Sequence, residues 1–240
     1  MVILRSILFN VLFYLNLAVQ AILYLPLLAL SRRHVIRATQ YWGRSTNWLL
    51  GVVAGIRIEF RGLENLPPGP LLIASKHQSA WETFGLVGVL ADPVFVYKRE
   101  LGWLPLYGWY CKRAGMIAVD RSGGAVALRR MSEEARAAIA FGRQIIIFPE
   151  GTRRPVGAEP DYKPGIGLLY GQLKVPCVPV ALNSGLFWRR RTFRRFPGTI
   201  IAEFLPPIPP GLPRAQFMAR LQNDIETATD RLVAEGRKQG

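Results

Sequence analysis

A histidine and a glutamate follow the short apolar run 71–74, and their spacing suggests acid–base chemistry. On one continuous helix, side chains five residues apart point about 140° away from each other, so His77 and Glu82 would not meet there. They can meet if His77 lies in a turn and Glu82 in the first turn of the next helix. An ionised carboxylate there would fix the tautomer of the imidazole, which makes His77 a candidate general base for a hydroxyl group. A polar strand-to-helix turn is the simpler alternative for this stretch alone, but the only other histidine is His34, in a basic segment.

Short apolar runs that alternate with helical patterns predict an α/β domain over residues 56–240, preceded by a helical pair over residues 1–55. Strands are expected over residues 56–60, 71–74, 94–97, 116–119, 145–148, 177–181 and 199–204. Helices are expected over residues 81–90, 104–114, 125–141, 165–173 and 214–235.

The segment 6–30 is almost entirely apolar and, at about 1.5 Å per residue, long enough to cross a bilayer. Its four polar residues fall within about 120° on one helical face. We therefore expect a helix that packs against a neighbour or lies deep in the interface, with a tilted span as the alternative. These polar residues are Ser6, Asn10, Asn16 and Gln20.

The segment 35–56 has the pattern of an amphipathic helix, and its Tyr41, Trp42 and Trp48 suit the headgroup level of a membrane. An ordinary core helix is an equally good interpretation of this pattern. Three arginines follow residue 30 and one precedes the apolar run, so we expect the residues after residue 30 to lie on the cytoplasmic face of a membrane. These are Arg32, Arg33 and Arg37, against Arg5.

The chain contains 31 Lys and Arg against 16 Asp and Glu, a net charge of +15 that implies an anionic partner. The segment 187–195 (FWRRRTFRR) would suit nucleic acid or anionic lipid headgroups. The apolar N-terminal segment favours a membrane with anionic lipids, and no nucleic-acid partner is expected. The two cysteines are far apart and predict neither a disulfide framework nor a zinc site.

Polar residues also follow other predicted strands, at the edge where open α/β sheets build their sites. After the run 144–148, Gly151 allows a tight turn, Thr152 offers a hydroxyl and Arg153 offers a forked cation that suits phosphate. A plain polar turn is the alternative. Asp120 is expected to pair with a neighbouring cation, and the Pro179 strand is expected near a sheet edge or a bulge.

Together these motifs resemble those of the 1-acyl-sn-glycerol-3-phosphate acyltransferase family. The match spans residues 56–182 and consists, in order, of His77-x4-Glu82, Lys98-Arg99-Glu100-Leu101, Gly115-x4-Asp120-Arg121, Phe148-Pro149-Glu150-Gly151-Thr152-Arg153 and Val178-Pro179-Val180. One departure is Glu82, where the family usually has aspartate. The resemblance implies a glycerophosphate-acyltransferase-like mixed sheet flanked by helices, with an N-terminal membrane-docking pair.

The resemblance also implies transfer of a fatty acyl group from acyl-CoA or acyl-carrier protein to the sn-2 hydroxyl of lysophosphatidic acid, without a cofactor or a metal. It makes His77 the base and Glu82 its orienting partner. Ser79 lacks the sequence context of an acyl-enzyme nucleophile. Alternatives are a related acceptor, such as a lyso-aminolipid or glycerol 3-phosphate, and a basic membrane- or nucleic-acid-binding module. The implied substrate-binding residues are Lys98, Arg121, Glu150, Gly151, Thr152 and Arg153.

Overall fold

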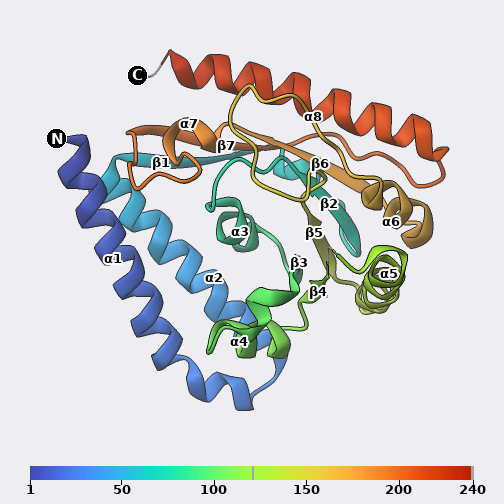
Figure 1. The fold of residues 1–240 in the computed structure, drawn as a ribbon, viewed down its shortest axis with the longest axis horizontal. Helices are drawn as coiled ribbons and strands as arrows, with labels where there is room; N and C mark the ends of the chain where they lie inside the picture. The colour runs from blue at the N-terminus through green and yellow to red at the C-terminus, as the bar shows by residue number, and fades with distance from the viewer. Residues whose placement is uncertain (121, 239–240) are drawn as a thin grey trace.

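The computed structural model describes residues 1–120 and 122–238, and within them seven strands form one sheet (Figure 1). In space the strands follow the order β1-β7-β6-β2-β5-β3-β4. Each of them overlaps a strand predicted from the apolar runs. Their bounds are Ile56–Arg61 (β1), Leu71–Ser75 (β2), Pro93–Lys98 (β3), Ile117–Val119 (β4), Gln144–Ile147 (β5), Cys177–Leu182 (β6) and Gly198–Phe204 (β7).

Five neighbouring strands, β6, β2, β5, β3 and β4, run parallel, so their carboxyl ends meet at one edge of the sheet. β7 runs antiparallel to β6, and β1 runs parallel to β7. The sheet is therefore mixed, which confirms the predicted fold class. Ligands of such sheets bind outside the carboxyl ends of the parallel strands. Each predicted motif with polar site residues follows one of these strands and is therefore delivered to that edge.

Helices cover both faces of the sheet (Figure 1). The α-helices are Val2–Leu23 (α1), Arg32–Leu49 (α2), Glu82–Gly85 (α3), Tyr107–Arg113 (α4), Gly124–Ala140 (α5), Gly165–Leu173 (α6), Ser184–Phe187 (α7) and Arg214–Arg237 (α8). Shorter 3₁₀ segments and one π segment join them, namely Leu25–Ala29, Leu50–Ala54 (π), Leu63–Asn65, Leu86–Val89 and Arg99–Trp103.

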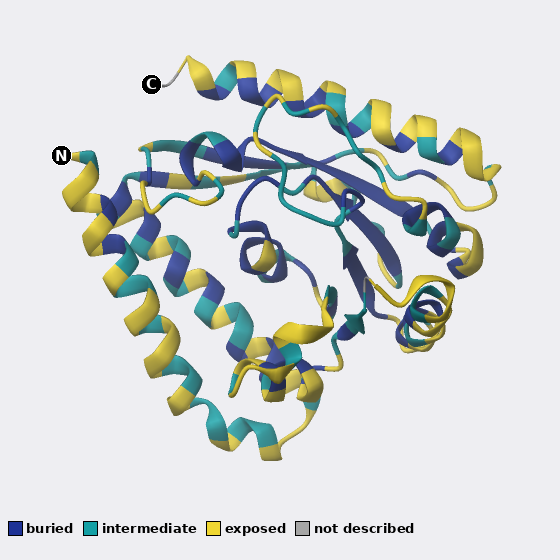
Figure 2. Ribbon diagram, in the orientation of Figure 1, coloured by how far each residue is buried: buried dark blue, intermediate teal, exposed yellow. Residues whose placement is uncertain are grey.

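Alternation along β2 divides the interior into two hydrophobic cores, because successive side chains of a strand point to opposite faces. Leu71 and Ile73 belong to a core that also contains Phe9 of α1 and Leu50 after α2. Leu72 belongs to the opposite core, together with residues of α5, α6 and α8. Figure 2 shows the resulting layer of buried strands between helices that are exposed on their outer sides. The predicted division at residue 55 stays a prediction, since the helical pair and the sheet share the first core.

The predicted helices 81–90 and 104–114 are shorter in the structure. The first is α3 followed by a 3₁₀ turn, and it contains Gly85 and Gly88, which favour helix weakly. The second starts only at Tyr107, because Leu106 has φ +63°, outside the right-handed helical region. The spacing of apolar residues and their helix propensity predicted a helix in both segments. Local backbone constraints determine where each helix begins and ends.

Pro179 lies in an interior strand, beside a register shift, so of its two predicted positions the structure shows the bulge and not the sheet edge. β6 is paired on both sides, with β2 and with β7. Between the bridge Cys177↔Ile208 and the pair Val180↔Phe204, two residues of β6 face three of the segment 205–207, which is the register shift of a bulge. A bulge is one of the few strand positions that tolerate the missing N–H of proline, and the Pro179 carbonyl oxygen accepts a hydrogen bond from the Leu205 N–H (2.9 Å).

The polar stripe of α1 packs against neighbouring elements, as predicted. Asn16 donates to the hydroxyl groups of Ser45 and Thr46 on α2 at 3.0 and 3.3 Å, and Gln20 donates to Ser45 at 2.8 Å. The outward side of α1 is an exposed apolar surface. By length and composition this helix could cross a membrane. α2 packs as a core helix through Trp42, which contacts Phe84, while Tyr41 and Trp48 on its outer side are exposed; their position at the headgroup level of a membrane stays a prediction.

Arg195 fastens the N-terminal half of α1 to the segment before β7. Its guanidinium, 6% exposed, donates to Asn10 Oδ1 and to the Thr192 carbonyl oxygen, both at 2.9 Å, and lies 4.3 Å from the Trp188 ring centre. Its backbone N–H donates to Ser6 Oγ at 2.8 Å. Burial lowers the pKa of Arg195 to about 10, which still leaves it charged at neutral pH. The helix is thus held by a buried cation as well as by apolar packing.

We expect Arg195→Ala to lower the free energy of unfolding by about 2–4 kcal/mol, because it leaves buried hydrogen-bond acceptors unpaired and removes the packing on Trp188. Urea unfolding in detergent, followed by tryptophan fluorescence, measures the loss. Arg194→Ala is the matched control, since Arg194 is exposed, and it should change stability by less than about 0.5 kcal/mol. Equal effects of the two substitutions would contradict a fastening role for Arg195.

Candidate active site

His77 and Glu82 meet just beyond the carboxyl end of β2. His77 lies in the turn after that strand and Glu82 is the first residue of α3, which is the arrangement that their spacing predicts. The His77 Nδ1 atom lies 3.6 Å from Glu82 Oε2. The imidazole is 12% exposed and the carboxylate is completely buried. A shift of about 0.5 Å would convert this contact into a direct hydrogen bond of normal length.

Glu82 is a buried carboxylate that the surrounding turn is built to hold. Its Oε1 accepts hydrogen bonds from the N–H groups of Gln78 (3.1 Å) and Ser79 (3.0 Å) and from the Ser184 hydroxyl. Its Oε2 accepts from the Ser79 hydroxyl at 3.0 Å. Burial favours a higher pKa, but the adjacent His77 and the hydrogen bond from Ser184 outweigh it, so the pKa of Glu82 is lowered. The carboxylate is therefore ionised at neutral pH and can orient the imidazole.

The His77 ring stacks on Phe148, with ring centres 3.8 Å apart and planes 13° from parallel. Its buried Nδ1 has no direct hydrogen-bond partner in the described part of the chain. The stack and the nearby carboxylate restrict the ring to one orientation. Ser79 is fully buried, with its hydroxyl between Glu82 and the Trp81 N–H (2.9 Å), which agrees with a structural role.

The turn that follows β5 lies against the turn that carries the histidine. Gly151 has φ +65°, a conformation that glycine adopts without strain, and its N–H closes the turn on the Phe148 carbonyl oxygen at 2.9 Å. The Arg154 N–H then donates to the His77 carbonyl oxygen at 2.8 Å. Thr152 and Arg153 lie between these two anchors and are half-buried. Within the described residues Arg153 has no carboxylate partner, so its guanidinium is available to a ligand.

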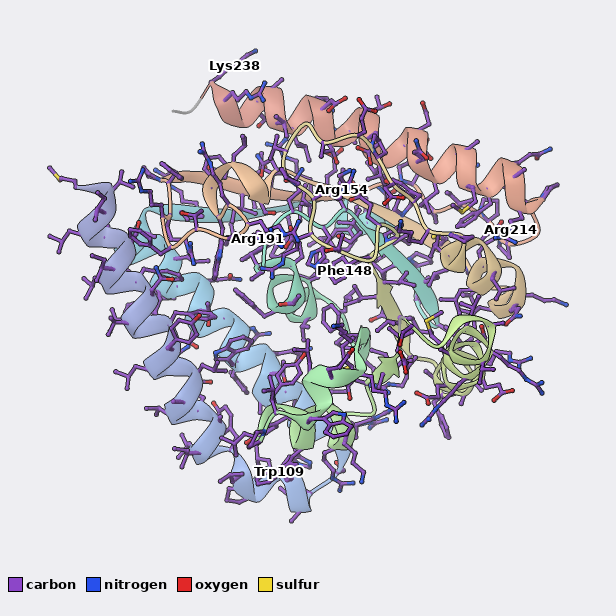
Figure 3. All side chains as sticks on the ribbon, viewed as in Figure 1. Trp109, Phe148, Arg154, Arg191, Arg214 and Lys238 are labelled. Carbon is purple, nitrogen blue, oxygen red and sulfur yellow. The ribbon has the colours of Figure 1, made fainter. Side chains whose placement is uncertain are left out.

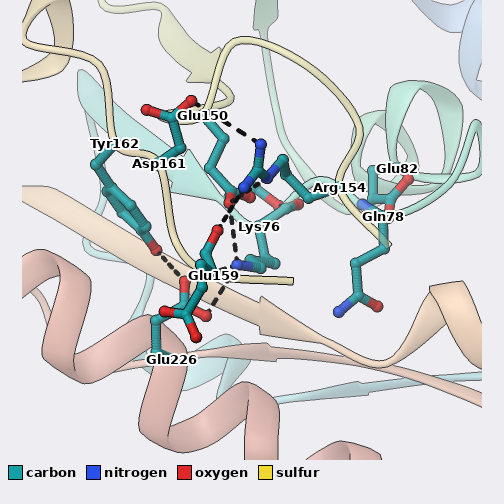
Figure 4. A network of polar contacts seen from close by, with 10 residues as sticks. Lys76, Gln78, Glu82, Glu150, Arg154, Glu159, Asp161, Tyr162 and Glu226 are labelled. Carbon is teal, nitrogen blue, oxygen red and sulfur yellow. Dashed lines mark hydrogen bonds and ion pairs between the residues drawn. The ribbon is translucent and has the colours of Figure 1, made fainter. Parts of the chain in front are cut away.

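The Glu150 side chain lies in a buried charge network, which Figure 4 shows. Its carboxylate is 1% exposed and lies 3.2 Å from the Lys76 ammonium, which also contacts Glu226 of α8 at 2.7 Å. Tyr162 donates to Glu226 at 2.8 Å. Burial raises the pKa of Glu150, and the positive charge of Lys76 opposes that rise. This placement favours a structural role for Glu150 over the substrate contact implied by the resemblance, because a ligand would have to displace Lys76 to reach it.

The remaining predicted residues lie on the neighbouring strand ends. Lys98 ends β3 and is about half exposed, with its ammonium 3.3 Å from Glu100. Asp120 accepts hydrogen bonds from Ser122 and lies 3.5 Å from Arg99, which confirms that it pairs with a cation. Arg121 lies outside the described residues.

Sequence reasoning missed several residues that complete the site. Ser184, which donates a hydrogen bond to Glu82, is the second residue after β6. It could have been predicted as a site residue, because polar residues that follow parallel strands lie at the edge where sites form. Phe148 begins the motif that ends at Arg153, but nothing in the sequence shows that its ring stacks on an imidazole. Lys76 and Glu226 are 150 residues apart, and only the fold brings them together.

The described residues contain no group of three or more His, Cys, Asp or Glu side chains arranged to hold a metal ion. Cys111 and Cys177 are both free and buried, in agreement with the expectation that they form no disulfide.

We expect Lys76→Met to lower the free energy of unfolding by about 3–5 kcal/mol, since it leaves Glu150 buried without a cation. Because the raised pKa of Glu150 makes the folded state take up a proton at a higher pH than the unfolded chain does, this loss should shrink as the pH falls below neutral. Denaturant unfolding at several pH values tests both points.

Two further variants make that measurement specific. Adding Glu150→Gln to Lys76→Met should restore stability and remove most of its pH dependence. Lys163→Met, which breaks the exposed 2.6 Å ion pair with Asp161, should cost less than about 1 kcal/mol. A loss in Lys76→Met no larger than in Lys163→Met would contradict a structural role for the buried network.

Comparison with known proteins agrees with this geometry. Residues 57–183 match the Acyltransferase family. The chain is 40% identical over 198 residues to the 1-acyl-sn-glycerol-3-phosphate acyltransferase of Pseudomonas aeruginosa, a match that covers 80% of this chain and 77% of that protein. It is 37% identical over 158 residues to the human 1-acyl-sn-glycerol-3-phosphate acyltransferase alpha, covering 65% of this chain and 56% of the human protein.

The fold is shared with the crystal structure of a 1-acyl-sn-glycerophosphate (LPA) acyltransferase from Thermotoga maritima. The two structures superpose with a TM-score of 0.81 at 21% identity, over 97% of this chain and 98% of the other. The chain therefore belongs to the 1-acyl-sn-glycerol-3-phosphate acyltransferase family and is an O-acyltransferase.

Proposed function

We propose that this protein transfers a fatty acyl group from acyl-CoA or acyl-carrier protein to the sn-2 hydroxyl of lysophosphatidic acid, forming phosphatidic acid. The observation that carries the proposal is the placement of His77. The imidazole is held by a buried carboxylate and an aromatic stack, beside a turn in which Arg153 has no carboxylate partner among the described residues. A base and, in the adjoining turn, an arginine without a carboxylate partner among the described residues suit an acceptor that carries both a hydroxyl and a phosphate.

In the proposed reaction, His77 removes the proton of the acceptor hydroxyl as its oxygen attacks the thioester carbonyl. The C–O bond forms, the C–S bond breaks, and the imidazolium returns the proton to the leaving thiolate. Glu82 stabilises the transient imidazolium, because it is ionised and in contact with the ring. The chemistry needs no covalent enzyme intermediate, which agrees with the burial of Ser79.

The acceptor phosphate is proposed to lie against the turn after β5. Gly151 permits close approach of the backbone, Thr152 offers a hydroxyl, and Arg153 offers two parallel N–H donors. Lys98 and Arg121 are proposed to assist from the ends of the neighbouring strands β3 and β4.

The protein is further proposed to work on the cytoplasmic face of the inner membrane, where anionic lipids attract its net charge of +15. The exposed apolar side of α1 supports contact with a membrane, since residues such as Leu4 and Val11 are 72% and 58% exposed. Trp48, Trp103 and Trp109 are more than half exposed and suit the headgroup level.

The direct test supplies the purified protein, in anionic vesicles, with lysophosphatidic acid and either acyl-CoA or acyl-carrier protein. We expect phosphatidic acid to form with at least one donor. Lysolipids with other headgroups and glycerol 3-phosphate serve as competing acceptors. A higher kcat/KM for one of these acceptors than for lysophosphatidic acid would contradict the proposed substrate.

Arg153→Ala should raise the KM for lysophosphatidic acid about ten- to a hundredfold, since one charge-assisted contact contributes roughly 1.5–3 kcal/mol. The phosphate is charged in both the ground state and the transition state, so kcat should change little. Steady-state kinetics with each substrate varied in turn separates the effect on the KM for lysophosphatidic acid from the effect on kcat.

Arg154→Ala is the matched control for this experiment. The Arg154 guanidinium donates to the Glu159 carbonyl oxygen at 2.6 Å and lies within 4 Å of the carboxylates of Glu150 and Asp161. Its loss should lower stability while leaving the KM for lysophosphatidic acid nearly unchanged. If Arg153→Ala raised only the KM for the thioester, the turn would hold the acyl donor and the assignment would have to be reversed.

A further inference from the structure

A cavity of about 580 Å³ lies between α7, the segment 155–156 and the C-terminal end of α8. Four arginines line it, Arg189, Arg190, Arg191 and Arg237, and none of the described residues in its wall is acidic. Its volume falls within the range of roughly 300–1,000 Å³ that small-molecule sites occupy. We refer to this cavity as the arginine pocket. Figure 3 labels Arg191 on the segment that joins α7 to β7.

Among the described residues, no carboxylate neutralises the positive charge of the arginine pocket. Within the described chain none of its four guanidinium groups lies within ion-pair distance of a carboxylate, and Arg189 instead lies over the Phe196 ring, 4.4 Å from its centre. An adjoining cavity of about 290 Å³ contains Lys76 but also Glu226 and Asp230, so its charge is mixed. Gathering like charges in a concave site raises the local concentration of anions there.

The backbone of Arg191 adopts a conformation that an arginine seldom adopts. Its φ is +58°, in the left-handed region where glycine and asparagine are favoured and other residues are strained. Strain of this kind is concentrated at binding and catalytic sites, where the surrounding structure maintains it. Glycine would fit this position with less strain but would remove one charge from the pocket.

The walls of the arginine pocket are bonded to the turn that carries His77. Gln78 lines the pocket, and the Gln78 Oε1 atom accepts a hydrogen bond from the Gly185 N–H of α7 at 3.0 Å. On the other side, the Arg154 N–H holds the His77 carbonyl oxygen, and the segment 155–156 that follows forms the opposite wall. Both walls are therefore fastened to the turn that carries His77.

We propose that the arginine pocket binds the phosphorylated nucleotide of an acyl-CoA donor, which rests on the proposed acyl transfer. The acceptor carries one phosphate, already assigned to the turn with Arg153, whereas the nucleotide end of CoA carries a diphosphate and a 3′-phosphate. Several arginines in one cavity match several phosphate groups. A concave pocket also fits a small molecule better than the broad surface of a carrier protein, which would need a larger and flatter interface.

The test is Arg191→Gly in the full-length protein. We expect the Kd for adenosine 3′,5′-bisphosphate and the KM for acyl-CoA to rise about ten- to a hundredfold, with the KM for lysophosphatidic acid unchanged. Glycine relieves the left-handed backbone, so misfolding would not explain a loss of binding. Lys174→Gly is the matched control: it removes one positive charge at a residue with φ +52°, at the C-cap of α6 and outside the pocket. It should leave both constants unchanged.

Nucleotide binding that is unaffected by Arg191→Gly would overturn the proposal. So would weaker binding to vesicles of phosphatidic acid with nucleotide binding intact, because the pocket would then hold lipid phosphates. A wild-type protein that uses only acyl-carrier protein and binds no nucleotide would overturn the pocket assignment while leaving the proposed acyl transfer standing. Nucleotide binding that depends on Arg191 in a protein that forms no phosphatidic acid would support the pocket and contradict the proposed function.

Discussion

The rest of the site depends on the burial of one ionised carboxylate, that of Glu82. An isolated buried charge costs several kcal/mol, so it persists only where hydrogen-bond donors converge on it. Those donors come from the turn after β2, through Gln78 and Ser79, and from the segment after β6, through Ser184. The ends of two adjacent strands are thereby tied to the start of α3. The histidine between them receives its position from the fold and does not depend on a substrate to place it.

Three consecutive residues connect this turn to three other parts of the molecule. Lys76 reaches back to Glu150 and to Glu226 of α8, His77 stacks on Phe148, and Gln78 is bonded to α7. A displacement of the turn would break a buried ion pair, a ring stack and a buried hydrogen bond together. This shared dependence explains how a site made of loops can be held accurately. It also couples the proposed acceptor turn and the arginine pocket to the same backbone.

The sequence alone allowed the strands and the contact of His77 with Glu82 to be predicted, because each depends on local patterns and on the common edge of parallel strands, whereas the mixed sheet was implied by the family resemblance. The polar stripe of α1 was likewise predicted to face neighbours, and it does. The direction in which Glu150 points could not be predicted, since its partner Lys76 is 74 residues away. The arginine pocket could not be predicted either: the basic run before β7 was visible, but its meeting with Arg237 depends on how α8 packs.

The most direct test of the account is the turnover of His77→Ala compared with that of His34→Ala. The second histidine is an exact chemical match, but it is exposed near the start of α2, where its Nδ1 atom lies 2.9 Å from the Ser31 hydroxyl. With lysophosphatidic acid and the preferred thioester in vesicles, His77→Ala should lower kcat by about 10²–10⁴ at unchanged membrane attachment, and His34→Ala should have little effect. Near-normal turnover in a folded His77→Ala protein would contradict the proposed mechanism.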